Sequence, residues 1–309
     1  MATAVFVGLS TLDIAYSVGR YPDEDTKTQA HDQFLGAGGP AANAAVAFAA
    51  LSGRTPALVT ALGEHQLAHL IRHDLDEYGV ATVDATPGAR HRPPVSSIVV
   101  ATEAGTRTLV SLDGSGIAAA FDPAHLGPLN DAAIVLVDGH YPELAFGFAA
   151  AARKRGIPVV LDAGRWRDSH AGLLPLIDIA ICSAAFAPPG VPSGTDEPAH
   201  PSPDHRPASD RHAMLFDYLH AHGVGSAAIT QGGGPIPYSM PGARGTVEVD
   251  TVAAFDTLGA GDIMHGAFCH YHVAGQKFPE ALRSAAGVAT LACGQLGTRA
   301  WIGSLPGAR

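Results

Sequence analysis

Short apolar and β-branched runs alternate along the chain with longer segments in which apolar residues recur at helical spacing. Strands are predicted at residues 4–8, 57–62, 133–139, 157–164, 177–182 and 226–230. Helices are predicted near residues 41–51, 64–77, 143–155, 211–222, 260–273 and 279–293. This alternation predicts an α/β fold, with a Rossmann-like, mostly parallel central sheet and helices on both faces. Such a sheet binds ligands at the carboxyl ends of its strands.

Three segments depart from this rhythm. Residues 13–35 and 94–112 alternate polar and apolar positions as hairpin strands do, and the sequence TEAGTR supplies a turn in the second segment. They predict a small antiparallel β lid beside the main sheet. Residues 187–209 are dense in Pro, Ser, Gly, Asp and His, and they are too polar to offset their ordering entropy by burial. A flexible surface loop is expected there.

Composition narrows the class of protein. The 309 residues are 47% hydrophobic, so one domain over residues 1–309 can bury a large core. A net charge of −10 without a basic cluster argues against nucleic acid or an anionic membrane as a partner. The three cysteines, Cys182, Cys269 and Cys293, are far apart and odd in number, as in proteins of reducing compartments. No signal peptide or membrane-spanning segment is recognisable, so a cytoplasmic location is expected.

The stretch FDTLGAGDIMHGAF combines a turn of small residues with a carboxylate at the start of a helix. The amides of Gly259, Ala260 and Gly261, together with the helix dipole, predict an anion site suited to phosphate. Asp262 would repel phosphate, so its useful role beside one is to accept a proton from an attacking hydroxyl group. Stabilisation of the positive helix end by Asp262 is the structural alternative.

A second glycine cluster lies in FLGAGGPAANAAVAFAALSG. Gly36, Gly38 and Ala41 match the dinucleotide-binding pattern G-x-G-x-x-A. That pattern belongs directly after the first strand, whereas the strand at 4–8 lies far upstream. A dinucleotide site is therefore disfavoured.

The segments GAGGPAANAAVAFAALSG and DTLGAGD, in this order, resemble the two signatures of the PfkB, or ribokinase-like, family of sugar and nucleoside kinases. GLSTLD, ITQGGG and AAGVATLACGQLG resemble further family segments, so the resemblance extends over essentially the whole chain. It implies a ribokinase-like fold, ATP and Mg²⁺ as cofactors, and transfer of the γ-phosphate to a primary hydroxyl group of a small sugar.

Position by position, the resemblance implies that Asp262 is the general base and that Gly259, Ala260 and Gly261 form the anion hole. The implied sugar site consists of Asp13, Gly38, Gly39 and Asn43, with Lys27 on the lid and His140 after the central strand as further candidates. The residue types suit a sugar, because close backbone approach, a carboxylate and an amide orient hydroxyl groups. Asp13 as a turn residue and Asn43 as a helix-terminus residue are the structural alternatives.

On the nucleotide side, the resemblance implies contacts from Thr230, Gly232, Ala289 and Cys293, with Arg165 as a cation that binds phosphate. Mg²⁺ is expected to be held by the nucleotide phosphates without a direct protein ligand, because Ser183 stands where many members carry the acid of an N-x-x-E segment. A monovalent cation such as K⁺ near Asp256 and Leu258 is left open. A homodimer formed through the β lid is also expected.

The sequence GGPAAN lacks the lysine that follows the glycine pair in ribokinase proper, and it is closer to the ketohexokinase and sulfofructose kinase branch. His140 stands where the sulfofructose kinase has an arginine, so a neutral ketose-like sugar is favoured. Two alternatives remain at this point. One is a nucleoside kinase, for which Tyr16 or Phe34 would stack on the base, and the other is a weakly active or non-catalytic sugar-binding homologue.

Histidines invite a metal hypothesis, but their pattern does not support one. His65, His69 and His73 recur every four residues along a predicted helix, and His265 follows the anion hole. No H-E-x-x-H pattern or cysteine partner accompanies them. The first three are therefore expected on a solvent-exposed face, and His265 is expected to line the pocket.

Overall fold

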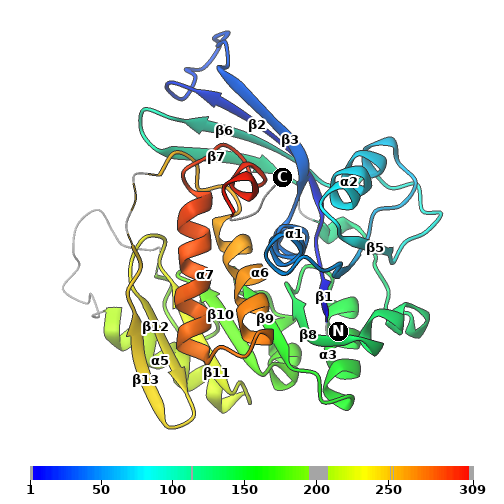
Figure 1. The fold of residues 1–309 in the computed structure, drawn as a ribbon, viewed down its shortest axis with the longest axis vertical. Helices are drawn as coiled ribbons and strands as arrows, with labels where there is room; N and C mark the ends of the chain where they lie inside the picture. The colour runs from blue at the N-terminus through cyan, green and yellow to red at the C-terminus, as the bar shows by residue number, and fades with distance from the viewer. Residues whose placement is uncertain (1–2, 113, 195–207, 251, 253, 306–309) are drawn as a thin grey trace.

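The computed structural model describes residues 3–112, 114–194, 208–250, 252 and 254–305, which form a nine-stranded and a four-stranded sheet with helices around them (Figure 1). No helix among these residues is both long enough and apolar enough to cross a lipid bilayer.

The large sheet has the order β13-β12-β11-β10-β9-β8-β1-β4-β5. From β11 to β5 all neighbouring strands are parallel, which confirms the predicted α/β class, whereas β12 and β13 add an antiparallel hairpin at one edge. In sequence order the strands are β1 (Thr3–Val7), β4 (Ala57–Thr60), β5 (Ala81–Asp84), β8 (Ala132–Val137), β9 (Val159–Ala163), β10 (Ile179–Ser183), β11 (Ser226–Thr230), β12 (Ile236–Met240) and β13 (Ala243–Val247).

Helices cover both faces of the large sheet, because successive residues of its strands point to opposite sides. Phe6 of β1 faces the core under α1 (Pro40–Ser52), α2 (Gln66–Glu77), α6 (Ala260–Val273) and α7 (Phe278–Ala292). Its neighbour Val5 faces the core under α3 (Pro142–Lys154), α4 (His170–Leu173) and α5 (Ala208–Ala221). Short 3₁₀ helices complete the fold: η1 (Gly114–Gly116), η2 (Pro123–Asn130), η3 (Leu174–Leu176) and η4 (Ala300–Ser304).

The small sheet is the predicted lid, and it projects beyond the ends of the large-sheet strands (Figure 1). Its order is β3-β2-β6-β7, formed by β2 (Thr11–Val18), β3 (Asp32–Gly38), β6 (Val95–Ala101) and β7 (Thr106–Ser111). The outer pairs are antiparallel as expected, but the central pair β2–β6 is parallel. The reason is connectivity, since α1, β4, α2 and β5 separate β2–β3 from β6 in the chain and no turn joins β2 to β6.

Residues 195–207 of the predicted loop lie outside the described residues. In the part before them, Arg211 on α5 donates to the carbonyl oxygen of Pro192 at 2.8 Å, and Val191 is buried. Arg211 also donates to the carbonyl oxygens of Ala184 at 2.6 Å and Phe186 at 3.2 Å, just before the loop. The flexibility of the loop stays a prediction.

Candidate active site

A pocket of about 350 Å³ lies between the lid, the carboxyl ends of β1 and β8, and the N-terminal end of α6. It brings together eight of the predicted site residues: Asp13, Gly39, Asn43, His140, Gly259, Ala260, Gly261 and Asp262. Leu9, Thr11, Pro40, Ser96, Arg107, Leu109, Ser111, Leu112 and Leu258 complete its lining. Segments from distant parts of the chain thus converge at the edge where the parallel sheet was expected to bind a ligand.

The glycine turn opens α6 as the sequence predicted. Gly259 has a φ of 66°, in the left-handed region, and a Cβ atom there would lie 2.6 Å from Cγ2 of Thr298. The first-turn amides of a helix have no partner within the helix, which is the basis of an anion site. The amide of Ala260 is partly used by the turn itself, since it donates to the carbonyl oxygen of Thr257 at 3.3 Å.

Asp262, in the first turn of α6, is held by a chain of polar contacts that ends at Arg299. Asn43 Nδ2 donates to Asp262 Oδ2 at 2.9 Å, and Asn43 Oδ1 accepts from Arg299 Nη1 at 3.0 Å. Arg299 is itself buried, and it donates to Asp74 at 2.8 Å and to the carbonyl oxygen of Ala37 at 2.7 Å. The orientation of Asn43 is therefore fixed, and Asn43 donates to the carboxylate.

The environment of Asp262 raises its pKa from 3.8 to about 7. Burial is the largest cause, and the negative charge of Asp162 is the second. The hydrogen bond from Asn43 and the proximity of His265 act in the opposite direction. The side chain is nevertheless partly exposed to the pocket, so it can reach a bound molecule. A carboxylate with a pKa near neutrality is suited to proton transfer at physiological pH.

Asp13 enters the pocket from the lid strand β2. Its carboxylate accepts from the hydroxyl group of Thr11 at 2.6 Å, and burial raises its pKa. A Cβ atom on Gly38 would lie 2.0 Å from Oδ2 of Asp13, so only glycine leaves room for the carboxylate at this point. Gly38 therefore serves the pocket indirectly, although it is not among the lining residues.

Asp138 is a polar residue that sequence analysis missed, directly after β8. Its carboxylate accepts from the amide of Leu9 at 2.8 Å and from the amide of His140 at 2.9 Å, and Nδ1 of His140 lies 3.3 Å away. Burial is the largest single effect on the pKa of His140 and lowers it, but the charge of Asp138 and its hydrogen bond together raise the pKa, and the net shift is upward. The pocket thus has, at the end of β8, an imidazole whose protonated form is favoured by Asp138. An acid directly after an apolar run was the available signal.

Several predicted residues lie outside the pocket. Lys27 is exposed on the lid, and Tyr16 is on the opposite face of β2 from Asp13. Phe34 packs against the apolar cluster that contains Leu258, and it is not among the residues that line the pocket. His265 is 5% exposed and is buried beneath the pocket, which corrects the expectation that it lines the cavity. Its burial follows from its place on α6, on the side that packs against the sheet.

The predicted nucleotide residues lie at neighbouring strand ends and on α7. Thr230 ends β11, and its hydroxyl group donates to the carbonyl oxygen of Cys182 at 3.3 Å. Gly232 follows in the turn with a φ of 60°. Ala289 lies on α7, and the carbonyl oxygen of Cys293 at its end accepts from the amides of Phe255 and Asp256. Arg165 is exposed after β9.

The carboxylate of Asp256 joins two backbone segments through hydrogen bonds. Its two carboxylate oxygens accept from the amides of Leu258 and Gly297, each at 2.8 Å. The loop before the anion hole is thereby tied to the turn after α7. Each carboxylate oxygen of Asp256 thus has one hydrogen bond and keeps a lone pair.

The lid contacts the glycine loop directly through Arg107. This residue of β7 lines the pocket, and its guanidinium donates to the hydroxyl group of Thr257, two residues before Gly259. The contact joins the lid sheet to the turn that opens α6.

In the described part of the chain, no group of three or more histidine, cysteine and acidic side chains is arranged to hold a metal ion. His69 and His73 are exposed, as expected for a solvent face. His65 instead caps α2, where Nδ1 accepts from the amide of Leu67 at 3.2 Å.

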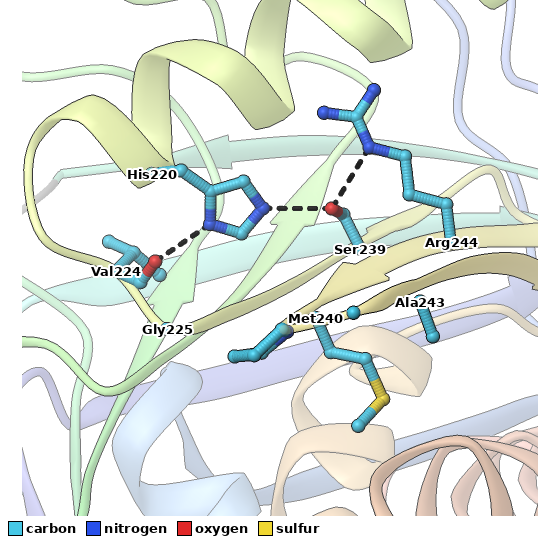
Figure 2. Close-up of a pocket in the computed structure, with 9 residues that line it drawn as sticks. His220, Val224, Gly225, Ser239, Met240, Ala243 and Arg244 are labelled. Carbon is cyan, nitrogen blue, oxygen red and sulfur yellow. Dashed lines mark hydrogen bonds between the residues drawn. The ribbon is translucent and has the colours of Figure 1, made fainter.

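A second pocket, of about 590 Å³, lies along the β12–β13 hairpin and shares no lining residue with the first (Figure 2). His220 lies between the carbonyl oxygen of Val224 and the hydroxyl group of Ser239, at 2.8 Å from each. Arg244 donates to Ser239 at 3.3 Å and to Asp217 at 2.6 Å. These polar side chains largely satisfy one another, which is typical of structural contacts.

Comparison with known proteins indicates the family. The family model described as pfkB family carbohydrate kinase matches residues 1–302. A ribokinase of Arabidopsis thaliana is 29% identical over 305 residues, which cover 93% of this chain and 75% of the relative. A putative ribokinase from Agrobacterium tumefaciens has a TM-score of 0.80 at 26% identity, over 98% of this chain and 94% of the other. The Arabidopsis thaliana ribokinase complexed with ribose and ATP has a TM-score of 0.75 at 24% identity, over 99% and 96%.

The relatives named here are ribokinases, so the comparisons give no support to the predicted ketohexokinase and sulfofructose kinase branch. The family itself is clear, because its model extends over almost the entire chain and the two glycine segments and Asp262 meet in one pocket. The protein belongs to the pfkB family of carbohydrate kinases.

Proposed function

We propose that the protein transfers the γ-phosphate of MgATP to a primary hydroxyl group of a small, neutral sugar. The observation that carries this proposal is the position of Asp262. It lies in the first turn of α6, at an amide-lined helix end, and it shares a pocket of about 350 Å³ with Asp13 and Asn43. A carboxylate at an anion site has its use when a hydroxyl group must lose a proton as it attacks phosphorus.

Asp262 is the proposed general base. With a pKa of about 7, it is ionised in roughly half of the molecules at neutral pH and becomes fully ionised above that. Asn43 holds one carboxylate oxygen at 2.9 Å and leaves the other for the sugar hydroxyl. The first-turn amides at Gly259, Ala260 and Gly261, with the α6 dipole, stabilise negative charge on the transferring phosphoryl group. Since the amide of Ala260 is partly engaged, the remaining first-turn amides have the larger share.

Mg²⁺ enters with the nucleotide as part of the substrate. Where many family members have an acid after the strand that corresponds to β10, Ser183 donates its hydroxyl group to the carbonyl oxygen of Gly164. Phosphate oxygens and water can hold Mg²⁺ without a protein cage. Thr230, Gly232, Ala289 and Cys293 are the proposed nucleotide contacts, and Arg165 is exposed at a strand end where it can reach a phosphate.

Asp13 and Asn43 are the proposed sugar contacts, with Gly39 and His140 beside them and Gly38 giving Asp13 its space. Hydroxyl groups of Thr11, Ser96 and Ser111 add further donors and acceptors. Two kinds of sugar, a ketose and ribose, are candidates for this site. A ketose is favoured by Pro40, which follows the glycine pair in place of a lysine, and ribose is favoured by the names of the relatives.

The nucleoside-kinase alternative depends on the stacking of a base on Tyr16 or Phe34. Neither side chain lines the pocket, so this alternative is less well supported. The alternative of a non-catalytic homologue rests on the missing acid at Ser183.

The lid has an exposed edge strand, β7, on which Val110 is 71% exposed, and this supports the expected homodimer through the lid. A cytoplasmic location, where ATP is available, is part of this proposal.

The test is a coupled assay of ADP formation with MgATP and a panel of ketohexoses, ribose, other pentoses, sugar acids and nucleosides. Sugar-dependent turnover by the wild type, lost by about a thousandfold in Asp262→Asn, is the expected result. Phosphorylation of nucleosides in preference to sugars would contradict the substrate class. Absence of turnover with every acceptor would favour the non-catalytic homologue.

A further inference from the structure

Beneath the pocket, Asp162 and His265 form a buried pair that no proposed step has used. Asp162 lies near the end of β9 and is 6% exposed, and His265 lies on α6 and is 5% exposed. Nδ1 of His265 is 3.2 Å from Oδ2 of Asp162, and neither atom has a hydrogen-bond partner elsewhere in the described part of the chain. Nε2 of His265 lies 3.2 Å from the carbonyl oxygen of Ile181 on β10.

We propose that Asp162 and His265 are positioning residues for the phosphoryl transfer, which act together through their charges on the catalytic carboxylate of Asp262. The proposal rests on the function proposed above. Neither residue lines the pocket, so neither touches the sugar or the nucleotide phosphates directly.

The spacing along α6 supports a direct influence. Asp262 and His265 are three residues apart, so they lie on the same side of the helix within one turn. Each ring nitrogen of the imidazole faces an oxygen atom. The carbonyl oxygen of Ile181 can only accept, so Nε2 is the nitrogen that donates to it. Nδ1 lies within ion-pair distance of Oδ2 of Asp162, at 3.2 Å.

The two side chains act on Asp262 in opposite directions, and this is the basis of their joint effect. Burial is the main cause of the raised pKa of Asp262, and Asp162 adds to it while His265 opposes it. The pKa of Asp162 itself is raised by burial, with His265 acting against this and Asp138 adding to it. Removal of one partner would therefore leave the effect of the other on the pKa of Asp262 unopposed.

Other charged groups face this cluster, and they have to be held constant in a test. Asp13 on β2 also raises the pKa of Asp262, and the hydrogen bond from Asn43 on α1 lowers it. Asp138 and His140, at the end of β8, interact with Asp162. None of these is changed by substitution of Asp162 or His265.

A structural role alone does not require these two residues. On the side of the core, the apolar residues Ile181 and Met264 are buried next to the pair. A buried ion pair is a weak source of stability, since desolvation offsets most of the attraction. Charge coupling to Asp262 accounts for two ionisable side chains at these buried positions, whereas apolar packing does not.

The experiment is a carboxyl ¹³C NMR titration of the protein without substrates, with the Asp262 resonance assigned by its loss in Asp262→Asn. His265→Gln should raise the midpoint of Asp262 by about 1 pH unit, because Gln retains a donor for Ile181 while Asp162 loses its counter-charge. Asp162→Asn should lower the midpoint, and the double variant should fall between the single variants. Asp168→Asn, an exposed acid on the loop after β9, is the matched control and should leave the midpoint unchanged.

The same variants are then assayed for kcat/KM against pH with the best sugar of the panel, and the acid limb should move in the same directions. Shifts of both single variants in one direction, or loss of activity by the same factor at every pH, would overturn the proposal and leave a structural pair. The titration does not depend on turnover. Coupling in the titration without kinase activity would therefore refute the proposed function, whereas activity without coupling would refute only the pair. Retained thermal unfolding cooperativity identifies variants that have folded.

Discussion

Replacement of Asp262 by asparagine should abolish activity and at the same time make the protein more stable, but only at neutral and alkaline pH. The pKa of Asp262 rises from 3.8 in the unfolded chain to about 7 in the folded protein. The folded state therefore binds more protons between these values, and the stability of the wild type falls as pH rises through this window. Asparagine has the same shape, can accept the hydrogen bond from Asn43, and does not ionise.

The magnitude follows from the shift. About 3 pH units at about 1.4 kcal/mol per unit correspond to about 4 kcal/mol at pH 8. Because the carboxylate is partly exposed to the pocket, water screens it, and a gain of about 2 kcal/mol is the realistic expectation. At pH 4.5 most of this difference should be absent, since Asp262 is then protonated in the folded protein.

The assay is urea unfolding of the wild type and Asp262→Asn at pH 4.5 and pH 8. Asp76→Asn is the matched control, because Asp76 is exposed on α2 and its side chain makes no hydrogen bond in the described structure. A gain for Asp262→Asn that is equal at both pH values would refute the electrostatic reasoning. A loss of stability at pH 8 would show that the carboxylate is stabilising and that its raised pKa is wrong.

Three further substitutions test other parts of the pocket. Gly38→Ala places a Cβ atom 2.0 Å from the carboxylate of Asp13, so KM for the sugar should rise at least about tenfold, while Gly287→Ala on an open face of α7 should leave it unchanged. An unaltered KM in Gly38→Ala would separate Asp13 from the sugar site. Arg299→Lys should lower the free energy of unfolding by about 3 kcal/mol in urea titrations, because one ammonium group cannot replace the several buried guanidinium contacts. Wild-type stability in this variant would contradict that reason. Arg107→Ala should raise KM about tenfold without a change in unfolding, since the side chain joins the lid to the glycine loop, and an unchanged KM would show that this contact is dispensable.

Local pattern was enough to predict the bounds of two elements, α6 and β11. The helix predicted at residues 260–273 and the strand predicted at 226–230 have the observed bounds of α6 and β11, because a glycine turn or a compact apolar run marks each one. The β12–β13 hairpin was not predicted. Its strands contain Pro237 and Gly245, which weaken the strand pattern, and only pairing with β11 makes them part of the sheet.

The support of the site was harder to predict than its reactive groups. Asp13, Asn43 and Asp262 belong to recognisable segments, so the sequence indicates them. Arg299 has no such signal, because its partners Asp74 and Asn43 precede it by 225 and 256 residues and only folding brings them together. The pairing of Asp162 with His265 was missed for the same reason.

The contact between Arg299 and Asn43 also has a consequence for the biosynthesis of the protein. A ribosome produces the chain from its N-terminal end, so the lid, α1 and most of the large sheet emerge long before Arg299. Until that residue is available, the side chain that donates to Asp262 lacks its own anchor. We therefore expect nascent chains to gain phosphotransferase competence only at the last stage of synthesis, after the lid, α1 and most of the large sheet have emerged.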